Sequence, residues 1–376
     1  METLKTRFAL SFKRKLQISI SIGLLFAGLL YLSLVMFRAT RVYTYIKANK
    51  VGFTGRIFAN HPLLGFAPVP EGSGAEIFPL PPPIPVRFDA NGFRIPSGSR
   101  AGMPLRRPLV LGLGCSFTYG TGCLAEEAYP YLVGEILHGD SLNAGVPSYG
   151  LVQILILARR WIPKFKPDYV IVAFAPWLVD RALSPFPVLQ FGFAPSPFFI
   201  EAPDGSLSFH PPVFPSRIFD LPVSEFRTTP RGSRDYIAFL LQAGFPLYFY
   251  NDSQRLAYGG KRFLGVIPPP ARDREKALKF SYSRIQELCA ENKAKMIIVL
   301  LRPPGPADLA ILRKIPGAVI VNAETALQNR LPEKTELAYR KAYWQWRGSV
   351  LIDWHPNARA HRIIAEEIVK AIQTVR

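Results

Sequence analysis

Two short stretches of the sequence hold residues that could do chemistry together. "LVLGLGCSFTYGTG", residues 109–122, places Ser116 where an apolar, strand-like run ends. "VLIDWHPNARAH", residues 350–361, places Asp353 two residues before His355 and just ahead of helical sequence. A serine hydroxyl is a weak nucleophile until a base takes its proton, histidine is such a base near neutral pH, and a carboxylate fixes its tautomer. We therefore interpret Ser116 as nucleophile, His355 as base and Asp353 as orienting acid.

The loop around Ser116 matches none of three common motifs. A dinucleotide fingerprint needs glycine where Phe117 stands, a phosphate loop needs Gly-Lys-Ser/Thr, and the G-x-S-x-G elbow needs glycine where Thr118 stands. A serine that only caps the following helix is the structural alternative. The Asp353–His355 pair favours catalysis, because none of the other four histidines closely follows an aspartate and precedes Pro-Asn. Among them, we expect His361 to pack within the terminal helix.

These residues sit in a chain whose pattern from residue 107 onward alternates strands and helices. Apolar strand-like runs occupy 108–114, 141–145, 168–176, 296–301 and 317–322. Helical segments occupy 125–137, 150–165, 271–293, 307–314 and 358–375. Continuous apolar strands between helices indicate a parallel sheet covered on both faces, with the site beyond the carboxyl ends of the strands. The Pro- and Phe-rich stretch 181–265 interrupts this order and indicates an insertion beside those ends.

Three blocks together resemble the SGNH (GDSL-like) hydrolase superfamily. They are "GCSFTYG" (114–120), "NAGVPSYG" (143–150) and "DWHPNARAH" (353–361), and "VRFDANGFR" (86–94) looks like the lead-in of membrane-anchored bacterial members. The resemblance covers roughly residues 61–376 apart from the insertion. It implies a five-stranded, flavodoxin-like three-layer α/β/α sandwich and acyl-ester chemistry through a serine ester. It also implies an oxyanion hole formed by the backbone N–H groups of Ser116 and Gly145.

The chain departs from the family pattern at three places. Cys115 replaces the usual Asp before the serine, and Asp353 stands two residues before His355 rather than three, a spacing shared with some polysaccharide acetyltransferases of the superfamily. The third block, "FAPWLVDRA" (174–182), lacks the asparagine that completes the oxyanion hole. Losing one such donor costs about 10²–10³ in rate. Either another group substitutes, such as a backbone amide near Trp177, or activity is weak or lost. Asp180 is then a structural acid paired with Arg181 or another base.

The N-terminus predicts a membrane anchor. Residues 16–37 form a run of 22 residues without a charge. At about 1.5 Å per residue, a helix of this length crosses a hydrocarbon core of about 30 Å. No small-residue cleavage site follows, so we expect an uncleaved anchor. Five basic residues precede the run and four follow it within residues 38–50. The excess places the N-terminus in the cytoplasm and the body outside the inner membrane, as a single-pass protein.

The predicted organisation has four parts. Residues 1–15 form a cytoplasmic basic N-terminus, 16–37 the transmembrane anchor, 38–104 a neck and proline-rich lead-in, and 105–376 the SGNH-like catalytic domain with its insertion.

The composition limits the kinds of ligand and partner that the protein is expected to bind. The net charge is +19, but no basic run with interleaved aromatics indicates nucleic-acid binding. The charge suits anionic headgroups or an acidic polymer. The three cysteines show no CxxC spacing, so no zinc site, other metal or cofactor is predicted, and pairing of Cys115 with Cys123 stays open.

Two functions follow from the sequence. The first is a membrane-anchored serine esterase or O-acyltransferase that acts on an acylated carbohydrate or another small ester, in an envelope or secreted polysaccharide. The alternative is a catalytically silent scaffold of the same fold that binds glycan or a membrane partner. The sequence does not indicate a protein partner.

Overall fold

A computed structural model describes residues 2–49, 52–99, 104–189, 192–215 and 233–374 of the chain. Its core is a sheet with five parallel strands, in the order β8-β7-β9-β14-β15. In chain order these are β7 (Leu109–Leu113), β8 (Asp140–Asn143), β9 (Tyr169–Phe174), β14 (Lys295–Leu300) and β15 (Val319–Asn322). This is the 2-1-3-4-5 order of flavodoxin-like, doubly wound folds. The predicted α/β fold class is confirmed.

Four antiparallel strands extend this sheet, so that it has nine strands within the described residues. They are β1 (Gly52–Gly55), β4 (Ser73–Ile77), β5 (Ile84–Phe88) and β6 (Arg94–Ile95), and β6 joins β8 through Arg94 and Asn143. The prediction of five strands therefore accounts only for the five parallel strands of this sheet. Strands of two to five residues in a proline-rich lead-in are too short to show a clear alternation. A separate hairpin, β2 (Phe58–His61) and β3 (Gly65–Pro68), lies beside them.

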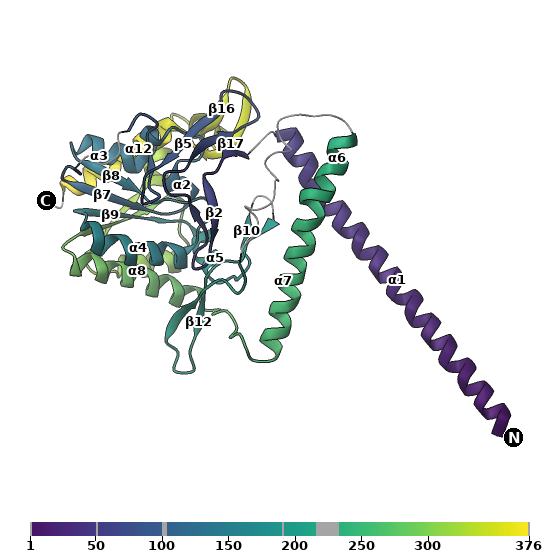
Figure 1. Ribbon diagram of the computed structural model, residues 1–376. Helices are drawn as coiled ribbons and strands as arrows, with labels where there is room; N and C mark the ends of the chain where they lie inside the picture. The colour runs from purple at the N-terminus through teal and green to yellow at the C-terminus, as the bar shows by residue number, and fades with distance from the viewer. Residues whose placement is uncertain (1, 50–51, 100–103, 190–191, 216–232, 375–376) are drawn as a thin grey trace.

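Helices cover both faces of the sheet (Figure 1). One layer holds α3 (Tyr129–Ile136), α10 (Ala323–Asn329) and α12 (Ala358–Gln373). The other holds α4 (Leu151–Phe165), α5 (Pro176–Ala182), α8 (Arg274–Glu291) and α9 (Pro306–Arg313). The central strands are buried from end to end, which explains why they are apolar throughout instead of alternating. After β15, α11 (Glu336–Tyr343) leads to a hairpin of β16 (Trp344–Arg347) and β17 (Val350–Pro356) outside the main sheet.

The predicted insertion contains two small hairpins and a long helical segment. The hairpins are β10 (Val188–Leu189) with β11 (Gly192–Phe193), and β12 (Phe198–Glu201) with β13 (Leu207–His210). The helical segment runs through α6 (Ser233–Phe239), a π-helical turn η4 (Leu240–Gly244) and α7 (Phe245–Phe263). Residues 190–191 and 216–232 of the insertion lie outside the described residues.

The N-terminal helix α1 (Glu2–Asn49) is continuous over 48 residues and includes the predicted span 16–37. Within Phe12–Thr44, an 18-residue window has a mean hydropathy of 2.3, so this part of the helix is long and apolar enough to cross a membrane. By length and composition it is either a signal sequence or a membrane anchor. Residues 38–49, the first part of the predicted neck, continue this helix.

Candidate active site

Ser116 begins the short helix α2 (Ser116–Tyr119), directly after β7. The glycines on either side make this turn feasible. A Cβ on Gly114 would lie 2.0 Å from Thr118 Oγ1 and 2.8 Å from Ala173 Cβ, so only glycine fits there. Gly120 ends α2 at φ +84°, a conformation that glycine adopts without strain. The G-x-S-x-x-x-G spacing thus places the Ser116 hydroxyl at the carboxyl edge of the parallel strands.

Asp353 and His355 lie within β17 rather than in a loop before the terminal helix. A bulge interrupts the pairing of β17 with β16 between Asp353 and Pro356, and the Asp353 side chain there folds back onto His355. Asp353 Oδ1 accepts a short hydrogen bond from His355 Nδ1 and a second one, of 2.8 Å, from the His355 backbone N–H. The two-residue spacing is therefore sufficient to bring the Asp353 carboxylate onto the His355 ring.

The environment of Asp353 keeps it ionised. Burial by itself raises the pKa of this carboxyl, but His355 and the hydrogen bonds from its ring and backbone outweigh burial and leave the pKa below its ordinary value. The side chains of His355 and Asp353 are only 12% and 16% exposed. Because Nδ1 faces the carboxylate, Nε2 is the ring nitrogen left to exchange a proton.

The three residues line a single pocket of about 280 Å³. Its wall also takes residues from β1, β4, the loop after β8, and α5. Aromatic rings frame the histidine, with Trp354 stacked at 4.6 Å and Phe117 at 5.2 Å between ring centroids. Among the described residues, no hydrogen bond joins the Ser116 hydroxyl to His355. In free enzymes this contact often forms only when substrate binds.

Gly145 does not offer its N–H to this pocket. That N–H donates to the Asn143 side-chain oxygen at 3.0 Å, and Gly145 is not part of the pocket wall. A Cβ on Gly145 would lie 2.3 Å from Tyr119 N, so glycine is needed for the loop after β8 to pack against α2. Ser116 differs, because the N–H of the first helical residue has no acceptor within its helix. Of the two predicted oxyanion donors, the structure leaves Ser116 N–H available and engages Gly145 N–H elsewhere.

Arg181 is a pocket residue that the sequence motifs did not assign to the site. It projects from α5, and its Nη1 donates to Tyr149 O at 3.2 Å while the guanidinium lies against the Cys115 thiol. Burial lowers the pKa of this guanidinium, and Cys115 and Asp180 offset part of the effect, so it remains a cation. Asp180, the alternative acid, is 64% exposed and pairs with Arg274 at 3.3 Å. No ion pair holds Arg181 within the described part of the chain.

Glu76 and Arg94 hold the loop that follows Ser116. Glu76 lines the pocket at 2% exposure and accepts the Gly122 N–H at 2.9 Å, and burial raises its pKa. Arg94, 3% exposed, donates to three carbonyls that follow Ser116 in the chain, those of Tyr119, Gly120 and Cys123 at 2.6–2.7 Å. The lead-in "VRFDANGFR" thus ends on a residue that shapes the turn after the nucleophile.

The remaining titratable groups singled out in the sequence are structural. His361 is fully buried, stacks on Tyr129, and burial lowers its pKa to about 3, so it packs within the terminal helix as predicted. Cys115, Cys123 and Cys289 are free and buried. Over the described residues, no group of three or more His, Cys, Asp or Glu is arranged to hold a metal ion.

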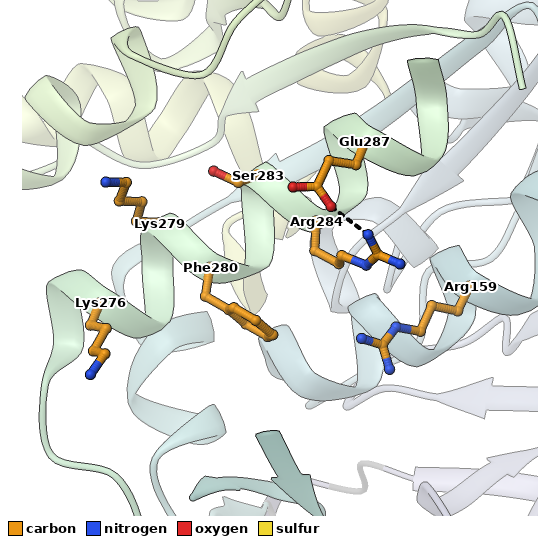
Figure 2. Close-up of a pocket in the computed structure, with 7 residues that line it drawn as sticks. All are labelled: Arg159, Lys276, Lys279, Phe280, Ser283, Arg284 and Glu287. Atoms are coloured by element: carbon orange, nitrogen blue, oxygen red, sulfur yellow. Dashed lines mark hydrogen bonds and ion pairs between the residues drawn. The ribbon is translucent and has the colours of Figure 1, made fainter. Parts of the chain in front are cut away.

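A second concavity contrasts with the first. An open groove of about 530 Å³ lies over α4 and α8, lined by Arg159 on α4 and by residues of α8 from Lys276 to Glu287. Figure 2 shows its serine, Ser283, among basic side chains, with Arg284 paired to Glu287. The groove wall has no histidine, so Ser283 lacks the base that a nucleophile needs.

Comparison with known proteins concerns the fold. No protein-family model matches the chain, and no curated protein matches it. Several solved structures match the chain in fold. A lipolytic protein of the G-D-S-L family from Veillonella parvula is 9% identical, with 70% of this chain and 98% of that one covered at a TM-score of 0.33. The esterase EstA from Pseudoalteromonas is 10% identical, with coverage of 71% and 98% and a TM-score of 0.34. A carbohydrate esterase of family 2 from Corynascus thermopiles (Myceliophthora fergusii) is 12% identical, with coverage of 80% and 72% and a TM-score of 0.34.

Proposed function

We propose that this protein is a serine ester hydrolase or O-acyltransferase. The observation that carries the proposal is that Ser116, His355 and Asp353, from elements far apart in the chain, line one pocket in which Asp353 already holds the His355 ring. Ser116 Oγ attacks the acyl carbon while His355 Nε2 takes its proton and passes it to the departing alcohol. A water molecule or an acceptor hydroxyl, activated by the same nitrogen, then releases the acyl group from Ser116.

The oxyanion of this reaction needs donors other than Gly145. The Ser116 N–H is one. Arg181 is the second, because its guanidinium carries five N–H donors, lies beside Cys115, and has no acid to pair with among the described residues. It extends from α5, the helix after the third strand, where the family asparagine is absent. We therefore assign Arg181 as the side-chain donor that stabilises the tetrahedral intermediate.

Anchoring through α1 completes the proposal. Val35, Ala39 and Tyr43 of α1 are buried against α6 and η4, and Arg38 pairs with Asp252 at 2.8 Å. Removal of α1 as a signal sequence would expose this cluster, so these contacts favour an uncleaved anchor. With the body outside the inner membrane, an acylated envelope or secreted polysaccharide is the proposed substrate, supported by the net charge of +19.

Active-site labelling tests the reaction. A fluorophosphonate should modify the folded wild-type protein on Ser116. The label should be absent in Ser116→Ala and strongly reduced in His355→Ala, since the base is lost. Ser283→Ala is the matched control, because Ser283 lies in a groove without a histidine, and it should label like the wild type.

A silent scaffold is the second candidate, favoured by the engaged Gly145 N–H and by the missing asparagine. If the wild type shows a native circular dichroism spectrum but takes no label and hydrolyses no aryl acetate, the scaffold function replaces the esterase.

A further inference from the structure

The helical segment 233–263 packs against the N-terminal helix on one side. Tyr31 of α1 donates to Asp252 at 3.0 Å, and Asp252 also pairs with Arg38. The approach is close, since a Cβ on Gly244 would lie 3.0 Å from Ala39 Cβ. Figure 1 shows the helical segment crossing the C-terminal part of α1, after which α7 runs away from α1 toward β12. The helical segment is therefore packed directly against the helix that we propose crosses the membrane.

The side of α7 opposite its buried residues carries large apolar residues that stay exposed to solvent, and the first of them, Phe249, also packs on Tyr31 of α1 with 5.7 Å between ring centroids. Phe249, Leu256 and Phe263 are 41%, 78% and 90% exposed. They recur every seven residues, about two helical turns, so they form one stripe along the helix. The residues that α7 buries, Leu247 and Tyr258 among them, lie on the other side. Leu264 and Val266, 73% and 67% exposed, continue the apolar surface just past the helix end. We call Phe249, Leu256, Phe263, Leu264 and Val266 the outer stripe.

Charge around the outer stripe indicates what covers it. Lys261 and Arg262, both exposed, occupy the last turn of α7 beside Phe263. The acid Asp252 is already neutralised by Arg38. Apolar residues bordered by basic side chains are typical of helices that lie in the interface of an anionic bilayer. Large apolar side chains exposed next to one another mark an interaction site on a protein surface.

We propose that the outer stripe of α7 inserts into the lipid interface next to α1. The bilayer with its anionic headgroups is the occupant, and the helical segment holds the body, with its pocket, against the membrane surface. This inference builds on the proposed anchoring of α1, which brings the stripe to the membrane surface.

Site-specific fluorescence in vesicles tests the contact. The full-length protein is reconstituted in phosphatidylethanolamine–phosphatidylglycerol vesicles. An exposed cysteine can be labelled selectively, because all three native cysteines are buried. Leu256→Cys and Phe263→Cys receive an environment-sensitive nitrobenzoxadiazole label, and Lys279→Cys, exposed on α8 of the body, is the matched control. Fluorophosphonate labelling or the circular dichroism spectrum of each variant verifies folding.

The expected result is a blue-shifted emission at 256 and 263 that spin-labelled lipids quench and aqueous iodide does not, with the reverse at 279. Quenching of 256 and 263 by iodide alone would overturn the proposal. Shielding from both quenchers, with energy transfer between labelled copies, would overturn it in favour of a second copy of the chain. An alkaline carbonate wash separates the two proposals: retention of the protein with iodide-accessible labels refutes the stripe alone, and release with lipid-shielded labels refutes only the anchor.

Discussion

Replacement of Asp353 by asparagine isolates the electrostatic part of the proposed triad. The substitution keeps the size of the side chain and removes its charge. In the wild type, one carboxylate oxygen accepts both the His355 ring Nδ1–H and the His355 backbone N–H. An amide can present its NH₂ to Nδ1 instead, which stabilises the tautomer with the proton on Nε2, the wrong nitrogen for a base.

The size of the effect follows from that geometry. A comparable loss in other triads slows the reaction by about 10²–10⁴, or about 3–5 kcal/mol in the barrier. Here the pair is largely shielded from water, so we expect a slowing within this range. The depressed pKa of Asp353 also stabilises the fold above the ordinary carboxyl pKa, and that contribution is lost as the pH falls through the folded-state pKa. The variant should lack this acid dependence of stability.

The assay is the pseudo-first-order rate of fluorophosphonate labelling at neutral pH, with circular dichroism to verify the fold. Asp180→Asn is the matched control, because Asp180 is exposed, pairs with Arg274 and does not line the pocket. It should react at the wild-type rate. A normal rate for Asp353→Asn together with a slow one for Asp180→Asn would refute the assignment of the acid.

Three further predictions address the oxyanion hole, the nucleophile loop and the topology. Arg181→Gln should lower kcat for an aryl acetate by about 10²–10³ with little change in the far-UV spectrum, and an unchanged kcat would remove Arg181 from the mechanism. Gly145→Ala should lower the melting temperature and the labelling rate together, because its Cβ would lie 2.3 Å from Tyr119 N; a stable, fully reactive variant would contradict the packing argument. A C-terminal alkaline phosphatase fusion should be active and the protein should resist alkaline carbonate extraction, whereas an inactive fusion would reverse the orientation and weaken the envelope substrate.

The sequence by itself determined the fold class and the place of Ser116 at the edge of the sheet. Uninterrupted apolar runs between helices already require a sheet buried on both faces, and Ser116 at the end of the first run falls at its carboxyl edge. The Asp353–His355 pair was visible because its partners are neighbours in the chain. The charge-free run 16–37 predicted the apolar helix for the same reason, since each of these signals is local.

Only the tertiary structure decided which groups share the pocket. Glu76, Arg181 and His355 come from β4, α5 and a hairpin outside the sheet, and no local pattern relates them. The Gly145 N–H was predicted to donate to the oxyanion. In the structure it donates to the side chain of Asn143, two residues away, because of the way the loop after β8 packs against α2. The same holds for α7. Phe249, Leu256 and Phe263 are apolar in the sequence, but the burial of Leu247 and Tyr258 on the other side of α7 decides that they stay exposed.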